Sequence, residues 1–382
     1  MKAAKTLAGL SGAGLIALTL GALAPPASAD PVAGSNDKVG VGSDTTQYLV
    51  DFLDDGAGIT PGYNFTHPGA RLQSYDATNP ITQANKNSTP VDMVILRQGQ
   101  APIPRPFGSG DGTKALGANG GTSNPSVNFA RVSRPLLTTN DESSKLTSFG
   151  VATDNIQIAV VRQTGTGSAT AVSTDAPGGL TNAELVNIYK GTYRLWSDIP
   201  NYTSRCGSAA GTSGFVCAPS NTIIPEIPQS NSGTRIAFES SLNISDSDLT
   251  NPNLDVTTEN DPTFLQSPRT NATPPVSQNA ADAIAPFASS KQQLDDSGFF
   301  NTTQPNYLGA TKLLTKTATT PDNTTYPFYT TNRTVFDVVR NADKATAFVT
   351  SAFASGGFYT DPDNGDPLVC AAFFTPIGRS CS

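Results

Sequence analysis

Few residues of this chain could carry out covalent or metal chemistry. Its 382 residues include one histidine, His67, and four cysteines. His67 stands in the turn-like stretch Thr66-His67-Pro68-Gly69, where a surface loop position is expected rather than a place in a Ser–His–Asp arrangement. One histidine and four cysteines do not suffice for the common zinc sites. The sequence therefore predicts a protein without a metal or cofactor.

The acidic segment Asp361-Pro362-Asp363-Asn364-Gly365-Asp366 comes nearest to a metal-binding motif. A calcium loop has glycine at its sixth position and a closing glutamate, whereas here glycine is fifth and no glutamate follows. A polar turn is expected instead. An enzyme such as a phosphohydrolase would need a metal cluster or an activated nucleophile, so catalysis is not predicted.

Small hydroxyl residues recur in a pattern that suits an anion. A strand, a turn of glycine, serine and threonine, and the start of a helix follow one another at Val39–Thr45, at Gly108–Gly110 and at Asn231–Thr234. Such a turn directs backbone N–H groups and hydroxyls toward an anion, with the positive end of the helix behind them. One turn of this kind is weak evidence, but three within one chain indicate an oxyanion site.

The elements that position these turns alternate between strand and helix. Asp44 and Gln47 form a capping-box pattern, which predicts a helix that ends at Gly56. A second helix is predicted from Thr181 to Gly191, with Trp196 and Ile199 packed beneath it. Strands are predicted at Val91–Leu96, Asn155–Val161 and Ile223–Ile227, and helices at Arg235–Leu242 and Ala342–Ala354. Residues 243–280 read as a polar insertion or long loop. The alternation predicts an α/β protein.

Charge excludes one large class of function. Only 14% of the residues are charged, and 31 acidic against 24 basic residues give a net charge of −7. The surface is therefore solvated mainly by neutral polar side chains. A nucleic-acid-binding protein would need a basic patch, and no long basic run is present.

The first 29 residues read as a signal peptide. Lys2 and Lys5 precede an apolar stretch, and Ala27-Ser28-Ala29 forms a cleavage site. A membrane anchor is the alternative, but glycines and serine interrupt the stretch and no other segment approaches the ~20 apolar residues that span a bilayer. The mature chain is expected to be secreted, or periplasmic in a cell with an outer membrane, and not inserted in the membrane.

The cysteines agree with export. Cys206 and Cys217 are 11 residues apart, and so are Cys370 and Cys381. Four cysteines allow three connectivities, and pairing between neighbours would close two short loops. Such bridges are typical of exported proteins, whereas a redox function would favour a CxxC spacing that is absent.

The chain resembles a known family, the phosphate-type substrate-binding proteins of ABC importers, and especially their secreted actinobacterial relatives. Four stretches carry the resemblance in the family's order: Val39–Gln47, Arg105–Leu116, Leu180–Ile199 and Ser230–Arg235. The third is similar to the family's LTxxEL…WSDI segment and is the most specific of the four. The likeness spans roughly residues 38–240.

The resemblance implies a class II fold of two α/β lobes with a hinge between them and the ligand buried in the cleft. Lobe 1 would comprise residues 30–153 plus 300–382, and lobe 2 residues 154–299. The family's binding positions fall on Ser43 or Thr45 in the first loop, Ser109 and Gly110 in the second, and Ser232, Gly233 and Thr234 in the last.

Two positions depart from the family. Ser133 stands where the family has a buried aspartate that accepts the proton of hydrogen phosphate, and Pro228 stands where it has an arginine. Arg131 and Arg134 are candidates for a replacement guanidinium, with surface ion pairs as the alternative. Asp44 could accept the proton, although helix capping is the favoured interpretation. Arg235 is expected to face outward.

These observations predict an exported, monomeric protein that binds phosphate or a related oxyanion for uptake by an ABC importer, whose permease would be its partner. The alternative is a secreted interaction or adhesion protein on the same fold with a degenerate anion site. The two departures and the lack of a lipid-anchor cysteine near Ala29 favour this alternative. A tight, saturable anion site would discriminate between the two.

Overall fold

A computed structural model describes residues 32–79, 82, 84–161, 174–206, 219–261, 280–300 and 311–381. The predicted signal peptide and Cys217 therefore lie outside the described residues. Within those ranges no helix is both long and apolar enough to cross a bilayer.

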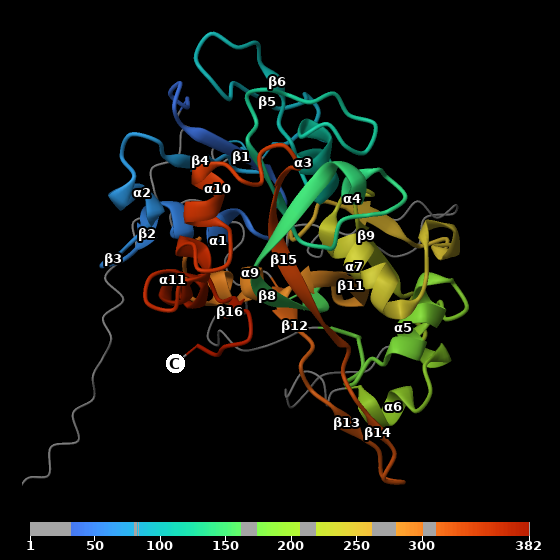
Figure 1. Cartoon of the computed structure of the whole chain (residues 1–382). Helices are drawn as coiled ribbons and strands as arrows, with labels where there is room; N and C mark the ends of the chain where they lie inside the picture. The colour runs from blue at the N-terminus through green and yellow to red at the C-terminus, as the bar shows by residue number, and fades with distance from the viewer. Residues whose placement is uncertain are drawn as a thin grey trace, which may run out of the picture.

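Two blocks of parallel strands, joined by two long antiparallel strands, form the central ten-stranded sheet (Figure 1). The strand order is β10 (Asp255–Thr257), β9 (Ile224–Pro228), β11 (Ala283–Ala288), β8 (Leu146–Val161), β15 (Thr330–Arg340), β7 (Phe129–Val132), β1 (Lys38–Gly42) and β4 (Leu72–Ser74). Strands β12 (Thr311–Leu313) and β16 (Thr375–Pro376) also pair with β8. Neighbours are parallel among β7, β1 and β4 and among β10, β9 and β11.

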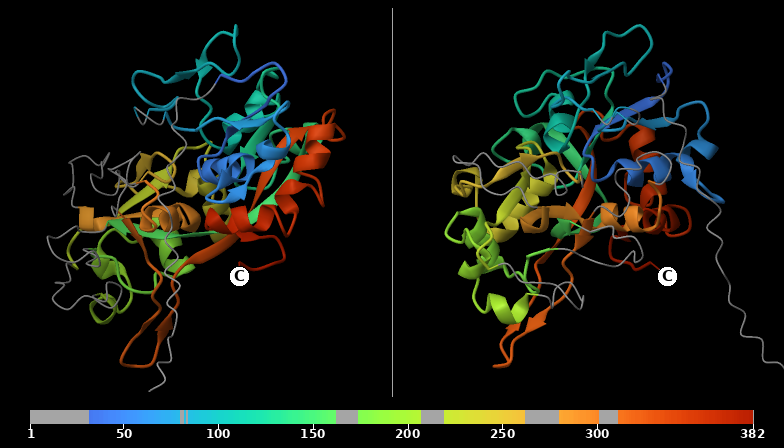
Figure 2. Two further views of the ribbon diagram at one scale, coloured as in Figure 1. Left: turned by 90° about the vertical axis from the view of Figure 1, so that its left-hand side faces the viewer. Right: turned by 180° about the vertical axis from the view of Figure 1, so that it is seen from behind.

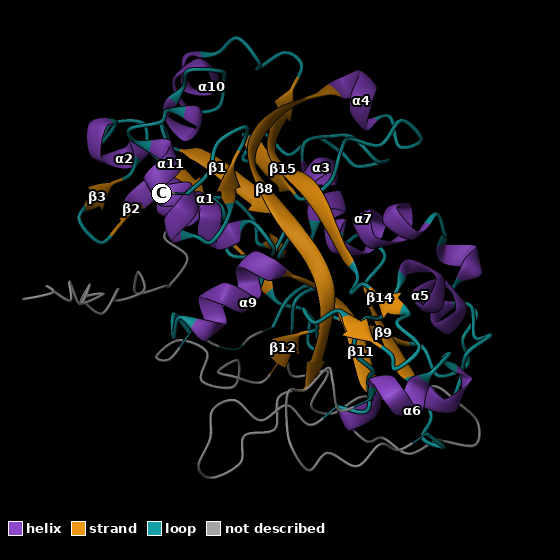
Figure 3. Ribbon diagram, turned by 90° about the horizontal axis from the view of Figure 1, so that it is seen from below, coloured by secondary structure: helices purple, strands orange, loops and turns teal. Residues whose placement is uncertain are grey.

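The long strands β8 and β15 run side by side through the centre of the molecule and belong to both halves of the sheet (Figure 3). Their register places Asp154 of β8 opposite Arg333 of β15. Three short hairpins stand outside the main sheet: β2 (Gly56–Ala57) with β3 (Thr60–Pro61), β5 (Met93–Val94) with β6 (Ile103–Pro104), and β13 (Ala318–Thr319) with β14 (Thr325–Tyr326). The β13–β14 hairpin projects from the body (Figure 2).

The helices gather in two groups. Around the β1 end of the sheet lie α1 (Gln47–Asp55), α2 (Tyr63–Thr66), α3 (Ser109–Ala115), α4 (Glu142–Lys145), α10 (Ala347–Ala352) and α11 (Gly365–Ala371). Around the β9 end lie α5 (Asn182–Tyr189), α6 (Tyr202–Arg205) and α7 (Gly233–Leu242), and α9 (Ser289–Asp296) follows β11. Short 3₁₀ turns occur at Trp196–Asp198, Asp246–Asp248, Ala280–Asp282 and Phe358–Thr360.

Each group of helices buries its own apolar core. Leu49 and Leu53 of α1 pack with Phe129, Val349 and Leu368. A separate cluster contains Trp196, Ile199 and Leu185 together with residues of α7 and β11. These two clusters give each half of the molecule an apolar core of its own, and a third cluster with Val39, Val41 and Leu116 adds to the core around β1. The predicted packing of Trp196 and Ile199 beneath the 181–191 helix is confirmed.

Most predicted elements are present, with shifted ends. Thr181 and Glu184 form a capping box at the start of α5, and β9 and α7 lie where expected. The predicted strand at Asn155–Val161 is the second half of the longer β8. The predicted strand at Val91–Leu96 is only the two-residue β5, and the C-terminal helix begins at Ala347 rather than Ala342.

The predicted Asp44–Gln47 capping box is wrong. Helix α1 begins at Gln47 with Thr46 as its N-cap residue, and no side-chain capping bond is made. The side chain of Gln47 instead accepts a hydrogen bond from the Ala77 amide at 3.0 Å. Asp44 lies two residues before the N-cap residue Thr46, so its side chain is available for other contacts.

The prediction that residues 243–280 form a loop outside the core is also wrong for the part that the structure describes. Strand β10 joins the main sheet beside β9, and the polar residues Asn251, Asn253, Glu259 and Asn260 are all buried. Amide and carboxylate side chains replace apolar ones here because they hydrogen-bond backbone groups, as Asn251 does with the Ile188 carbonyl at 2.7 Å.

One predicted disulfide, Cys370–Cys381, is present. Cys206 is also disulfide-bonded, and its predicted partner Cys217 lies outside the described residues. The acidic segment 361–366 is the predicted polar turn, in which the Asp361 carboxylate accepts bonds from the Asp363 and Asn364 amides before α11 begins. No group of ligand-type residues suited to a metal ion occurs among the described residues.

Candidate anion-binding site

The predicted loops meet where the carboxyl ends of the two parallel blocks face each other. Ser43 follows β1 and Ser133 follows the parallel neighbour β7, while residues 229–234 and 258–260 follow the parallel pair β9 and β10. Ligands of open α/β sheets bind outside the carboxyl ends of their strands. The topology alone therefore places both sets of loops at a binding edge.

Gly42 lets the first loop turn tightly against β7. Its φ is +131°, and a Cβ at this position would come within 2.5 Å of the Arg131 carbonyl oxygen. Only glycine fits this backbone and this space. The next residue, Ser43, donates its amide to the same carbonyl at 3.0 Å and so holds its hydroxyl at the carboxyl end of β7.

Three buried serine hydroxyls gather at that position. Ser43 Oγ donates to Ser133 Oγ at 3.0 Å, Ser109 Oγ lies 3.3 Å from Ser133 Oγ, and the Ser133 amide donates to Ser109 Oγ at 3.0 Å. Gly233 covers this cluster from the other half of the molecule. A Cβ on Gly233 would come within 2.2 Å of Ser133 Oγ and 2.4 Å of Ser109 Oγ, so the contact requires glycine.

Two buried threonines form the second part of the site. Thr45 Oγ1 and Thr234 Oγ1 lie 3.2 Å apart. Both hydroxyls donate to Glu259 Oε1, at 2.9 and 2.7 Å, and the Thr234 amide reaches the same oxygen at 3.3 Å. Asn260 Nδ2 donates to Thr45 Oγ1 at 3.0 Å. These hydrogen bonds therefore connect the first loop, the start of α7 and the segment that follows β10.

Two cations border the threonines, and each is paired with a carboxylate. Arg333 Nη1 donates to Thr234 Oγ1 at 2.8 Å, and its Nη2 lies 2.8 Å from Asp154 Oδ2. Lys291 Nζ lies 3.4 Å from Asp44 Oδ1. The two cations and the carboxylates Asp44, Asp154 and Glu259 are all buried.

Burial raises the pKa of Glu259, and the neighbouring Asp44 raises it further. The hydrogen bond from Thr234, the charge of Arg333 and the hydrogen bond from Thr45 oppose this shift. The direction follows from the low dielectric of the site, which penalises the charged carboxylate more than the bonds stabilise it. Protonation of Glu259 is therefore easier than that of an exposed glutamate.

Some predicted residues do not reach the hydroxyls. Arg134 forms a two-pronged pair with Glu142, at 2.7 and 2.9 Å, and both side chains are buried. Burial opposes ionisation of Glu142, but the hydrogen bonds from Arg134 and the Leu137 amide lower its pKa overall. A planar guanidinium on a carboxylate is a structural pair, so Arg134 is already neutralised.

Arg131 lies behind the first loop rather than in front of it. Its Nε donates to the Ser43 carbonyl at 3.3 Å and its Nη1 donates to Ser74 Oγ. On the sheet it stands opposite Asp337, whose pKa burial raises to about 7 although Arg131 opposes the shift. The guanidinium thus supports the loop through the Ser43 carbonyl.

The remaining predicted residues have local roles. Ser232 Oγ caps α7 by accepting from the Arg235 amide at 3.1 Å, and the Gly110 amide donates to the Asn231 carbonyl at 3.1 Å across the two halves. The expectation that Arg235 faces outward is wrong. It is buried and bonds the Pro228 carbonyl, Glu239 and Asp246.

Sequence reasoning missed Asp154, Glu259, Asn260, Lys291 and Arg333. Asp154 and Arg333 are charged residues within the paired strands β8 and β15. The predicted strand began one residue after Asp154, and no strand was predicted around Arg333, so their pairing was not found. Glu259 and Asn260 carried no usable signal, because they stand in a polar segment that resembles a loop.

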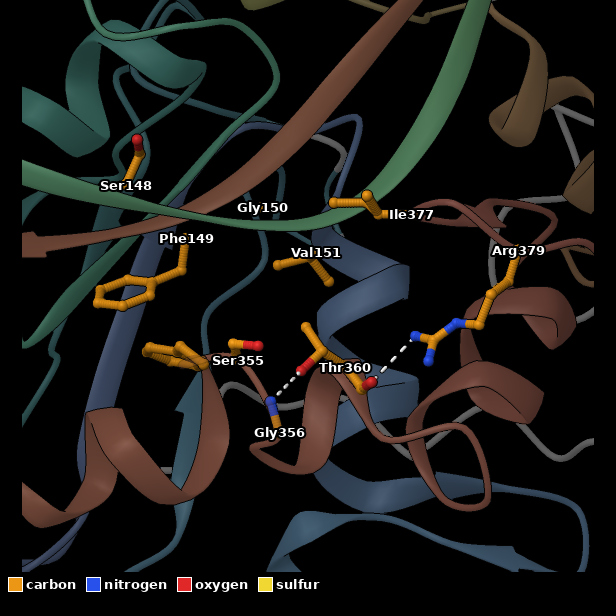
Figure 4. Close-up of a pocket in the computed structure, with 10 residues that line it drawn as sticks. Ser148, Phe149, Gly150, Val151, Ser355, Gly356, Thr360, Ile377 and Arg379 are labelled. Carbon is orange, nitrogen blue, oxygen red and sulfur yellow. Dashed lines mark hydrogen bonds between the residues drawn. The ribbon is translucent and has the colours of Figure 1, made fainter.

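A separate hollow of about 500 Å³ contains none of these residues. It lies between β8 and the 353–360 segment and is lined by Phe149, Val151, Phe353 and Ile377 with Arg379 at one side (Figure 4). Arg379 donates to the Thr360 carbonyl at 2.9 Å and pairs with Asp366 at 2.8 Å. The candidate site is therefore the hydroxyl cluster and not this hollow.

No family model and no curated protein matches the sequence. Among solved structures, the chain is similar to one from Clostridium perfringens described as a phosphate ABC transporter substrate-binding protein with bound phosphate, with 14% identity and a TM-score of 0.51 over 91% of this chain and 100% of that one. The chain also matches an ABC-type phosphate transport receptor from Vibrio cholerae, with 17% identity and a TM-score of 0.46 over 88% and 98% of the two chains.

The fold is that of the two-lobed periplasmic binding proteins. The predicted α/β fold class is thereby confirmed. At this identity the likeness concerns the fold alone. In this chain the long strands β8 and β15 connect the two halves of the sheet.

Proposed function

We propose that this chain is an exported solute-binding protein that takes phosphate, or a related tetrahedral oxyanion, between two lobes for uptake by an ABC importer. Lobe 1 comprises residues 30–153 plus 300–382 and lobe 2 residues 154–299. The protein binds and delivers its ligand and makes no covalent bond. Its partners are the oxyanion and the importer's permease.

The observation that carries this proposal is the convergence of five buried hydroxyls from separate segments. Ser43 and Thr45 come from the first loop, Ser109 from α3, Ser133 from the end of β7 and Thr234 from α7. Hydroxyls can turn their protons toward each oxygen of a tetrahedral anion. The Thr234 amide at the amino end of α7 points into the site, where the positive end of the helix dipole favours a negative charge.

The contacts between the halves support capture by hinge closure. The Gly110 amide donates to the Asn231 carbonyl, and Gly108 approaches Asn231 so closely that a Cβ would lie 2.8 Å from the same oxygen. These contacts close the site from solvent, so a ligand enters or leaves only when the halves separate about β8 and β15.

Export is supported by chemistry outside the cleft. The Cys370–Cys381 bridge closes a loop near the C-terminus, and disulfides persist in oxidising compartments. The amino-terminal pattern of Lys2, Lys5 and Ala27-Ser28-Ala29 is typical of a signal peptide that directs secretion.

Equilibrium dialysis with radiolabelled phosphate tests the proposal. The mature protein is first stripped of ligand, and Thr234→Val is compared with Thr350→Val, whose hydroxyl is exposed and bonds only its own helix. We expect saturable binding by the wild type, a loss of about 10- to 100-fold for Thr234→Val because a hydrogen bond to a charged ligand disappears, and no change for Thr350→Val. Absence of saturable binding by the wild type at millimolar phosphate would overturn the proposal.

A further inference from the structure

The carboxylate of Glu259 occupies the donors that an oxyanion would need. Its Oε1 accepts the hydroxyls of Thr45 and Thr234 and lies within reach of the Thr234 amide. Three donors on one carboxylate oxygen are the arrangement expected for an oxygen of a bound anion. Glu259 is 1% exposed, so these bonds form away from water.

The segment after β10 holds this carboxylate in the site. The Glu259 amide donates to Gln229 Oε1 at 2.9 Å, and the next residue, Asn260, adopts a φ of +52° with its Oδ1 accepting from the Ala288 amide at 2.9 Å. Glu259 Oε2 has no hydrogen-bonding partner in the described part of the chain. One oxygen is therefore fully used and the other is open to a proton.

The charges around Glu259 leave no surplus positive charge for an anion. Asp44 faces it from the first loop and Arg333 from β15, while Arg333 also pairs with Asp154 of β8 and Asp44 with Lys291 of α9. Among these five buried groups the carboxylates exceed the cations by one. A dianion bound at the threonine hydroxyls would lie close to the carboxylates of Asp44 and Glu259. Repulsion between these negative charges means that the dianion binds only if the protein or the ligand gives up one negative charge.

We propose that Glu259 is an internal competitor for the oxyanion donors and that an anion replaces it there only together with one proton. The inference rests on the proposed function. A new O–H bond forms on the Glu259 carboxylate. Its proton comes either from solvent or from a protonated anion, whose own O–H bond then breaks and which keeps the electron pair and one more negative charge. No other bond is made or broken. The resulting carboxyl group no longer competes for Thr45 and Thr234 as an anion. Glu259 thereby determines which anions the cleft accepts, and it favours those that bring a proton.

Sulfate is the sharpest probe because it does not titrate near neutral pH. Calorimetric titrations of sulfate and of phosphate, each in two buffers of different ionisation enthalpy, count the protons taken up on binding. For the wild type we expect uptake of about one proton with sulfate and an affinity that falls up to tenfold per pH unit from pH 6 to 8. Glu259→Gln keeps the size of the side chain without its charge. It should bind sulfate at least tenfold more tightly at pH 8, without proton uptake.

Asp363→Asn serves as the control, because it removes one exposed carboxylate outside the site. It should titrate as the wild type does. Wild-type sulfate binding without proton uptake overturns the inference even if Glu259→Gln fails to fold. Loss of phosphate affinity in Glu259→Gln with sulfate affinity unchanged also overturns it, since Glu259 would then be a ligand to the anion. If neither protein binds either anion at pH 6, the proposed function itself fails.

Discussion

The hydroxyls of Thr45 and Thr234 lie 3.2 Å apart although 189 residues separate them in the chain. One belongs to the loop after β1 and the other to the first turn of α7, so the contact joins the two halves of the molecule at the carboxyl ends of their parallel strands. The same geometry explains why a glycine follows Ser232. Any side chain at that position would hold the halves apart.

Gly233→Ala is expected to prevent closure. Its Cβ would lie 2.2 Å from Ser133 Oγ and 2.4 Å from Ser109 Oγ, and neither short side chain can move far within a buried cluster. We predict a loss of phosphate affinity of 100-fold or more, measured by equilibrium dialysis, and a larger radius of gyration in solution scattering. Gly69→Ala, where a Cβ meets nothing within 4 Å, is the matched control. Wild-type affinity in Gly233→Ala would show that the halves do not close through this contact.

The substitution Arg134→Gln tests whether Arg134 stabilises the fold or binds the ligand. Its removal leaves Glu142 as an uncompensated buried charge, which should lower the free energy of unfolding by about 3–5 kcal/mol in chemical denaturation. The folded protein should still bind phosphate as the wild type does. Arg71→Gln breaks an exposed pair with Asp55 and should cost less than about 1 kcal/mol. A large, selective loss of phosphate affinity in Arg134→Gln would place this guanidinium in the site after all.

The sequence predicted the positions of the anion-binding loops better than the partners of the charged side chains. Ser43, Ser109 and Thr234 could be found because each stands between a strand and a helix, and the topology of parallel strands then brings such positions to one edge. The charges could not be assigned in the same way. An arginine can point toward the site or pair with a carboxylate elsewhere. Which of the two occurs depends on the register between strands that are far apart in sequence, as for Arg333 of β15 opposite Asp154 of β8.

Residues 243–280 show a second limit of sequence reasoning. Their composition of asparagine, threonine and proline is typical of loops, yet Glu259 and Asn260 are buried in the centre of the molecule. Polar side chains are buried here where hydrogen bonds to distant segments satisfy them, for example Asn260 with the Ala288 amide and Asn251 with the Ile188 carbonyl. Periodicity of apolar residues carries no information about such a site.

Asp282 should make stability depend on pH. Burial and the neighbouring Asp175 raise the pKa of Asp282 to about 7, while its bond with Trp196 Nε1 at 2.8 Å opposes the shift. The folded state then holds a proton between about pH 4 and 7 that the unfolded state has released, so this group's contribution to stability falls as pH rises through that window.

Asp282→Asn tests this directly, because an amide can accept from Trp196 and donate to Asp175 without any proton uptake. We predict that the melting temperature of the variant falls less than that of the wild type between pH 5 and 8, and that the variant is the more stable at pH 8. Asp363→Asn is the exposed control. Parallel curves for Asp282→Asn and the wild type would contradict the assignment.

The Cys370–Cys381 bridge should contribute to stability without affecting the ligand. The two cysteines are 11 positions apart in sequence. A bridge over a loop of this length is expected to raise the free energy of unfolding by about 3 kcal/mol, because it restricts the unfolded chain. The double variant Cys370→Ser/Cys381→Ser should therefore unfold at lower denaturant concentration. Phosphate binding in dialysis should remain unchanged, and a coupled loss of affinity would indicate that the bridge also positions the cleft.

Isothermal titration calorimetry of the stripped mature protein with phosphate, at pH 7, tests the central claim most directly. We predict one site per chain with a dissociation constant in the micromolar range or tighter, and the loss of this heat in Thr234→Val. Absence of heat, together with a melting temperature that phosphate and sulfate leave unchanged, would contradict the account. The hydroxyl cluster would then be a contact between two halves of a secreted interaction protein.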